Sequence, residues 1–158
     1  MRSFLCKKWA QEDHQAGHAV RWQRHALALT RAAYGNEHPE TSRRLSNYGI
    51  ALMAAGQMAE AEPPLREAVG IARRIYRGPN ADVAPRVHNL GSVYLALGRL
   101  DQAEPLLREA IAIEHAITRE RAPGIGFSLA KLSRIQELRG DLAGARTLAD
   151  EARAQLDK

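Results

Sequence analysis

The feature of this sequence that most constrains its fold is an internal repeat of 42 residues. When residues 34–75 are laid over residues 76–117 without a gap, fifteen of the 42 positions are identical. The identities include Asn47/Asn89, Gly49/Gly91 and Gly56/Gly98, and the runs 61–63 over 103–105 and 65–68 over 107–110. A repeat of this length indicates one supersecondary unit whose neighbouring copies complete each other's core.

Weaker copies flank these two. Residues 118–158 form a third copy, in which Gly140 follows Gly98 by one period. Residues 24–35 lie over 66–77, so the segment 1–33 is interpreted as a degenerate first unit without its leading linker. We therefore predict one repeat domain over 1–158, with repeats at 34–75, 76–117 and 118–158 behind that first unit.

Each copy is predicted to form two helices. In the second copy, Val83, Val87 and Leu90 follow helical spacing, and residues 100–117 carry a second apolar face. Gly98 lies between them, where a helix commonly ends in the left-handed conformation. Pro105 is tolerated about one turn into the second helix. Because Ala and Leu dominate the apolar residues, the fold class is predicted to be all-α.

The pattern Leu90-Gly91-x-x-Tyr94, followed by the small or apolar residues Gly98, Ala103, Leu107 and Ala110, resembles the tetratricopeptide repeat. That family's usual period is about 34. The longer period here, the HPET linker at 38–41 and the EAEPPL and QAEPLL blocks at 60–65 and 102–107 are similar to the kinesin light chain variety. The HPET linker is altered in the second copy and the Glu-Pro pair at 104–105 is lost in the third.

The resemblance implies an α-α superhelix, a solenoid of stacked antiparallel hairpins, with a concave groove lined by the first helix of each hairpin. It further implies a scaffold that holds a peptide or protein segment and that is not an enzyme. From the register, the groove is expected to present Arg43, Ser46, Asn47, Ile50, Met53, Pro85, His88, Asn89, Ser92, Leu95, Phe127, Ala130, Lys131, Arg134 and Glu137.

Two subsets of these residues suggest what is bound. Asn47 and Asn89 occupy one repeat position, and an amide can pair with any peptide backbone because it both donates and accepts. The alternative is that each amide is satisfied by its own helix or by water. Arg43, Lys131 and Arg134 make the expected groove positive, so an acidic partner segment is the hypothesis.

The charge is uneven, and it argues against a nucleic-acid partner. The net charge is +5, of which residues 1–33 supply +4 from six basic and two acidic residues. Most other arginines are near a carboxylate in sequence, as on a solvated helix face, and no dense basic stripe with aromatic residues occurs. No apolar run approaches the roughly 20 residues of a membrane span. Cys6 is the single cysteine, which suits a reducing cytoplasmic location and no cofactor or metal.

Rival chemistry rests on few residues. His14, His18 and His25 would share one face of a continuous helix, and histidines four residues apart can share a metal. A solvated polar stripe is the favoured interpretation, because by register this face points outward and no carboxylate or cysteine at matching spacing completes a ligand set. Gly17 could also interrupt the helix. Cys6 and His14 could form a nucleophile and base, or Cys6 could simply be buried. The glycines in 124–127 are interpreted as a linker into the third hairpin rather than a phosphate-binding loop.

The two tryptophans leave a structural question open. Trp9 and Trp22 lie in the degenerate first unit, where packing in the core or capping of the stack is the main expectation. The alternative is an exposed apolar end that docks a second copy, because open solenoid ends invite association. Three other interpretations of the whole chain compete with a scaffold. The chain could be a small-molecule-binding regulator, an enzyme that reuses this architecture, or one piece of a larger repeat protein.

Overall fold

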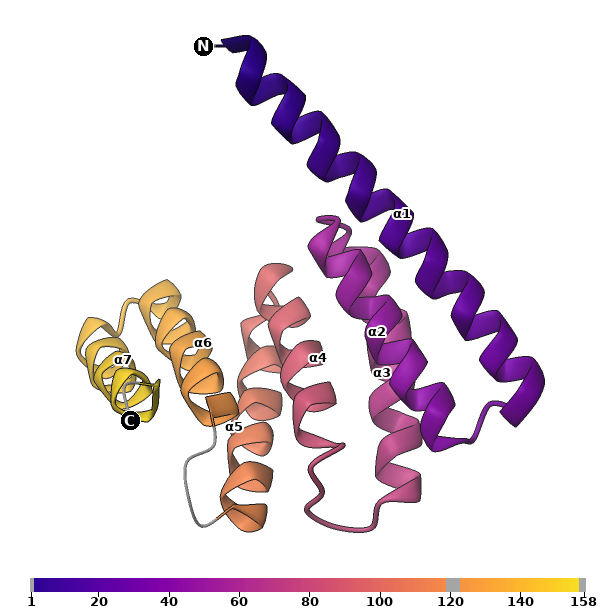
Figure 1. Cartoon of the computed structure of the whole chain (residues 1–158). Helices are drawn as coiled ribbons and strands as arrows, with labels where there is room; N and C mark the ends of the chain where they lie inside the picture. The colour runs from indigo at the N-terminus through magenta and orange to yellow at the C-terminus, as the bar shows by residue number, and fades with distance from the viewer. Residues whose placement is uncertain (1, 119–122, 157–158) are drawn as a thin grey trace. The chain divides into compact units, whose positions relative to one another are not determined.

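The computed structural model describes residues 2–118 and 123–156, with the side chains of residues 17–118 and 124–156. Within these ranges the regular structure is helical throughout, as the sequence predicted (Figure 1). The helices are α1 (Arg2–Tyr34), α2 (Pro39–Ala54), α3 (Met58–Ile75), α4 (Ala84–Ala96), α5 (Leu100–Ile117), α6 (Pro123–Arg139) and α7 (Leu142–Leu156). From α2 onward they pack as antiparallel pairs, α2 with α3, α4 with α5 and α6 with α7. The chain divides into two compact units, residues 1–71 and 72–158, with the boundary inside α3.

One glycine per hairpin sets the turn between its two helices. Gly56, Gly98 and Gly140 have φ values of 74°, 72° and 85°, and they are spaced by the 42-residue period. In this left-handed region a Cβ would approach the following carbonyl oxygen, so glycine is strongly favoured. The predicted end of a helix at Gly98 is confirmed, and the same device recurs in the other two hairpins.

In the first unit, α1, α2 and the start of α3 share one core. The Thr41 hydroxyl donates to the Gly35 carbonyl at 2.6 Å, and this bond ties the start of α2 to the end of α1. The Ser42 hydroxyl donates to the Ala68 carbonyl at 2.8 Å and links α2 to α3. Around these bonds the apolar side chains are almost fully buried. They are Leu27 of α1, Leu45 and Leu52 of α2, and Leu65 and Val69 of α3.

Small residues allow the paired helices of a hairpin to approach closely. A Cβ added to Gly91 of α4 would lie 3.1 Å from the Leu107 Cγ on α5, and Ala103 and Ala110 are fully buried. In the first unit, Gly49 lies over Leu65 with even less room, since an added Cβ would be 2.4 Å from the Leu65 Cγ. Interiors of this density do not accept an extra methyl group without a shift.

Ion pairs follow the same period on the surface. In the first unit the Arg31 guanidinium lies 2.6 Å from the Glu67 carboxylate. In the second unit Arg73 and Glu109, each 42 residues later, lie 2.6 Å apart. Such half-exposed pairs contribute at most about 1 kcal/mol each. Their repetition shows that the repeat register extends from the core to the solvated face.

The segment before residue 34 differs from two expectations. It forms one 33-residue helix, α1, and Gly17 does not interrupt it. Trp22 is 73% exposed, so the expectation that it packs in the core is wrong. Without a first helix of its own hairpin in the described structure, α1 has too few neighbours to cover this side chain. Cys6, Trp9 and His14 lie outside the residues whose side chains are described.

The segment 124–127 is also not a linker. α6 begins at Pro123, so both glycines lie within the helix. The space around Gly126 explains its presence, because an added Cβ would be 2.8 Å from the Leu156 Cγ and 3.2 Å from the Ala152 carbonyl oxygen of α7. The sequence pattern could not distinguish a flexible glycine from one that makes room for a neighbouring helix.

Candidate functional site

The first helix of each hairpin was expected to line the binding groove, and in the first unit that helix is α2. Ile50 is 44% exposed, and Arg43 is exposed and paired with Glu40. Asn47 and Met53 are half-buried. Ser46 is only 7% exposed, so it offers little surface to a ligand. The face is thus a mixture of apolar and polar groups within one helix.

In the second unit, α4 and α6 lie side by side and form a continuous face. On α4, His88, Asn89 and Leu95 are half-buried, and Pro85 is exposed. Ser92 is 6% exposed, and its hydroxyl donates to the His88 carbonyl of the same helix at 2.8 Å. Two expected face residues, Ser46 of α2 and Ser92 of α4, are therefore buried.

A hydrogen bond joins the two helices of this face. His88 Nδ1 of α4 and Ser128 Oγ of α6 lie 2.7 Å apart. Ser128 is fully buried, and the sequence did not single it out. The sequence held only a weak indication of this role. Ser128 precedes Lys131 by three residues, which places the two side chains one turn apart on the same side of α6. The bond holds the imidazole ring in place between the helices.

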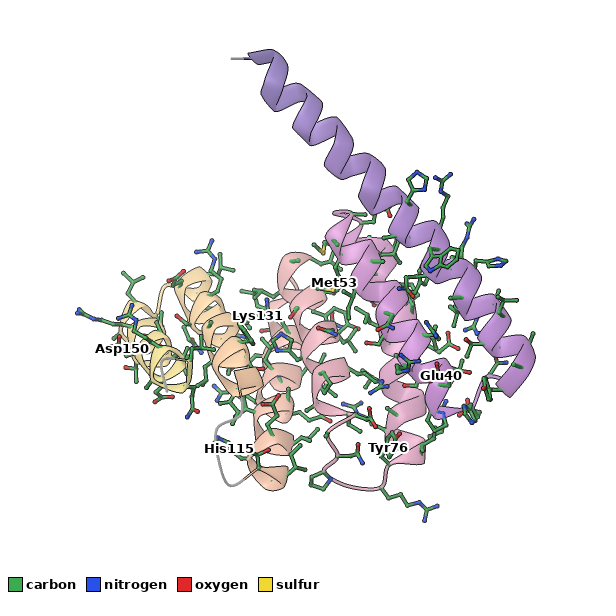
Figure 2. The ribbon with its side chains drawn as sticks, viewed as in Figure 1. Glu40, Met53, Tyr76, His115, Lys131 and Asp150 are labelled. Carbon is green, nitrogen blue, oxygen red and sulfur yellow. The ribbon has the colours of Figure 1, made fainter. Side chains whose placement is uncertain are left out.

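The environment of His88 keeps its ring uncharged. Burial, assisted by the nearby Lys131 charge, lowers the pKa of His88 from 6.5 to about 4. At neutral pH the positive charge of the face therefore comes from Lys131 and Arg134. Figure 2 shows Lys131 on the side of α6 toward α4.

The exposed part of the face belongs to α6. Phe127 is 56% exposed, so more than half of its side chain is available to a ligand. Ala130 and Arg134 are also exposed, and Lys131 is half-buried. Arg134 lies 2.7 Å from Glu137, a solvated pair that costs little to separate. An aromatic ring beside two cations can hold both an apolar side chain and a carboxylate.

The two asparagines that share a repeat position, Asn47 and Asn89, are partly accessible. Asn47 and Asn89 are half-buried, and neither amide makes a hydrogen bond to another residue in the described ranges. Both side chains are partly accessible to water, so pairing with a peptide backbone rather than with water stays a prediction. Asn47 belongs to α2 of the first unit and Asn89 to α4 of the second unit.

The rival sites receive little support from the geometry. In the part of the chain that the structure describes, no group of three His, Cys, Asp or Glu side chains could hold a metal ion. His18 and His25 are exposed on α1, and His18 Nδ1 lies 3.1 Å from an Arg21 guanidinium nitrogen. His14 and Cys6 lie outside the described side chains. None of the described helices is long and apolar enough to cross a membrane.

Comparison with known families gives a match over most of the chain. The tetratricopeptide repeat family matches residues 9–74 and 83–158. A search among curated proteins found no match.

Solved structures are similar over nearly the whole chain. The nearly identical TPR-like repeats of a Podosopora anserina protein named as a kinesin light chain share 25% identity, with a TM-score of 0.78, over 93% of this chain and 70% of that chain. A variant of the same repeats gives 26% identity and a TM-score of 0.79, over 93% and 69%. BtubC (BKLC) from P. vanneervenii shares the fold with a TM-score of 0.80 at 19% identity, over 91% of this chain and 57% of that one.

Proposed function

The chain belongs to the tetratricopeptide repeat family, and on that premise we propose that it is a scaffold that binds a peptide segment of another protein. Domains of this family typically bind proteins and are generally not enzymes. The observation that carries the proposal is the face formed by α4 and α6, where Asn89, Phe127, Lys131 and Arg134 are accessible together.

The chemistry of this face favours an acidic segment. Lys131 and Arg134 supply the charge, since the lowered pKa of His88 leaves its ring neutral at pH 7. The amide of Asn89 is available to a peptide backbone, and Phe127 can cover one apolar side chain. On α2, Asn47 and Ile50 offer the same two kinds of contact.

The test compares the partners that the chain recovers from a native lysate of its source. The unmodified chain and the Asn47→Ala/Asn89→Ala variant are used as baits, and bound proteins are quantified by mass spectrometry. Partners held through Asn89 on the α4 and α6 face, or through Asn47 on α2, should be depleted about tenfold with the variant, because a backbone contact is lost in either case. Equal recovery of every partner by both baits would place the binding site elsewhere.

Charge is tested separately on any partner so identified. Lys131→Glu/Arg134→Glu should weaken its binding by tenfold or more and reduce the salt dependence of what remains. The matched control is Arg146→Glu/Arg153→Glu, which makes the same change in net charge at exposed positions of α7. If both double variants weaken binding equally, net charge rather than this face attracts the partner.

A further inference from the structure

A cavity of about 340 Å³ lies among α5, α6 and α7 of the second unit. Its apolar lining consists of Ile111 and Ala112 of α5, Leu129 and Leu132 of α6, and Leu148 of α7. Its polar lining consists of Arg108, His115 and Glu151. A volume of this size, lined by apolar side chains and a few polar groups, is typical of a binding site. The cavity does not include the residues of the α4 and α6 face described above.

Two polar residues of the cavity occupy the repeat positions of an ion pair. In the two earlier copies an arginine pairs with a glutamate two helices later, at 2.6 Å in each case. These pairs are Arg31 with Glu67 and Arg73 with Glu109. One further period of 42 residues leads to His115 on α5 and Glu151 on α7. The third copy therefore keeps the carboxylate but has histidine in place of the arginine.

The Glu151 carboxylate is available at the edge of the cavity. Within the described ranges it makes no ion pair or hydrogen bond, and the residue is exposed. Arg108 of the lining is already bound to Glu104 of its own helix, with Nη2 at 2.7 Å and Nε at 3.0 Å from one carboxylate oxygen. Charge complementarity therefore selects a cation at Glu151, and in both earlier copies that cation is a guanidinium.

The apolar lining is more accessible than its repeat equivalents. Val69 is 2% exposed and Val87 is fully buried. One period later, Ile111 is half-buried and Leu129 is 9% exposed. The methylene stem of an arginine, or an apolar side chain next to it, can cover such a surface while the charged group remains at the edge.

We propose that the cavity binds an arginine side chain of a partner segment together with an adjacent apolar residue. The guanidinium pairs with Glu151, and the apolar residue covers Ile111 and Leu129. Arginine is favoured over lysine because its planar donors match a carboxylate with two parallel bonds. This cavity and the α4 and α6 face therefore select opposite charges, so the chain has two binding sites that accept different segments.

The experiment titrates the full chain, labelled with ¹⁵N, with N-acetyl-leucyl-arginine amide. The matched probe is N-acetyl-leucyl-citrulline amide, which has nearly the same shape without the charge. Amide signals of α5, α6 and α7 around the cavity should shift and saturate with the arginine probe. The citrulline probe should bind about fivefold more weakly, which is the upper range for an exposed ion pair.

Variants at the two repeat positions test the origin of this preference. Glu151→Gln should make the two probes bind equally. His115→Arg restores the arginine of the earlier copies, so its guanidinium should pair with Glu151 and remove the preference for the arginine probe. His115→Gln is the control for loss of the imidazole and should retain the preference.

The control for net charge is Asp150→Asn, which makes the same change as Glu151→Gln at an exposed residue of α7 outside the cavity lining. Circular dichroism checks that each variant keeps its helicity. The proposal is overturned if neither probe shifts the cavity signals, if both bind equally, or if Asp150→Asn acts like Glu151→Gln. It is also overturned if His115→Arg keeps the full preference. None of these outcomes affects the α4 and α6 face, which is tested with other variants.

Discussion

At the scale of single residues, position in the fold gives one side-chain type different properties. His88 is held between two helices by Ser128, and burial lowers its pKa to about 4. His115 is exposed at the end of α5. Both are histidines within repeat helices, and the sequence offered no basis for expecting that the His88 ring would be held between two helices.

The lowered pKa of His88 predicts a dependence of stability on pH. Between pH 6.5 and 4 the unfolded chain takes up a proton at His88 that the folded chain does not, so the free energy of unfolding decreases as the pH falls. At pH 4.5 the loss is about 2 kcal/mol, from about 1.4 kcal/mol per pH unit. Urea denaturation at pH 7 and pH 4.5 measures it.

Carboxylates also titrate between pH 7 and 4.5 and contribute to the loss of stability. The contribution of His88 is therefore obtained by comparing the loss in the unmodified chain with the loss in His88→Gln. That variant should lose less stability on acidification than the unmodified chain, although it is less stable at pH 7. The control His115→Gln should keep the full pH dependence. An identical loss in all three proteins would show that His88 is protonated in the folded state.

At the scale of elements, the contact between the two helices of a hairpin is the unit that repeats. Gly49 and Gly91 occupy one repeat position and face Leu65 and Leu107 respectively. The sequence showed that both copies carry glycine there. It did not indicate that the first hairpin is tighter than the second, because that depends on how each leucine side chain is placed.

This difference in spacing predicts unequal effects of one substitution. In Gly49→Ala the new Cβ would lie 2.4 Å from the Leu65 Cγ, so the helices must shift at a cost of about 1–3 kcal/mol, which exceeds the gain of about 1 kcal/mol in helix propensity. In Gly91→Ala the distance to the Leu107 Cγ is 3.1 Å, and the two effects nearly cancel. Denaturation midpoints in urea should fall for the first variant and hardly move for the second. Equal midpoints would contradict this account.

At the scale of the whole molecule, repeat proteins are stabilised mainly by contacts between neighbours, so a local defect is expected to remain local. Ala152 of α7 is 4% exposed and packs against Ile125 and Leu129 of α6. Ala152→Arg should force α7 away from α6. Hydrogen exchange should then accelerate across α6 and α7, with little change in α2.

The matched control is Ala154→Arg, which places the same side chain at an exposed position of α7. Its exchange pattern should equal that of the unmodified chain. If Ala152→Arg accelerates exchange equally in every helix, the chain unfolds as one cooperative unit, and the nearest-neighbour description is wrong for it.

The sequence alone was sufficient for the helical hairpins after residue 34 and for the turns at Gly56, Gly98 and Gly140, because spacing and glycine conformation are local properties that recur every 42 residues. It was not sufficient for residues 124–127, which belong to α6. Only the tertiary structure showed that Trp22 is exposed and that Ser92 is buried. It alone showed the bond between Ser128 and His88. Burial and hydrogen bonding depend on which helix lies opposite a side chain. A repeat pattern gives each residue a face, but whether another helix covers that face is decided when the chain packs.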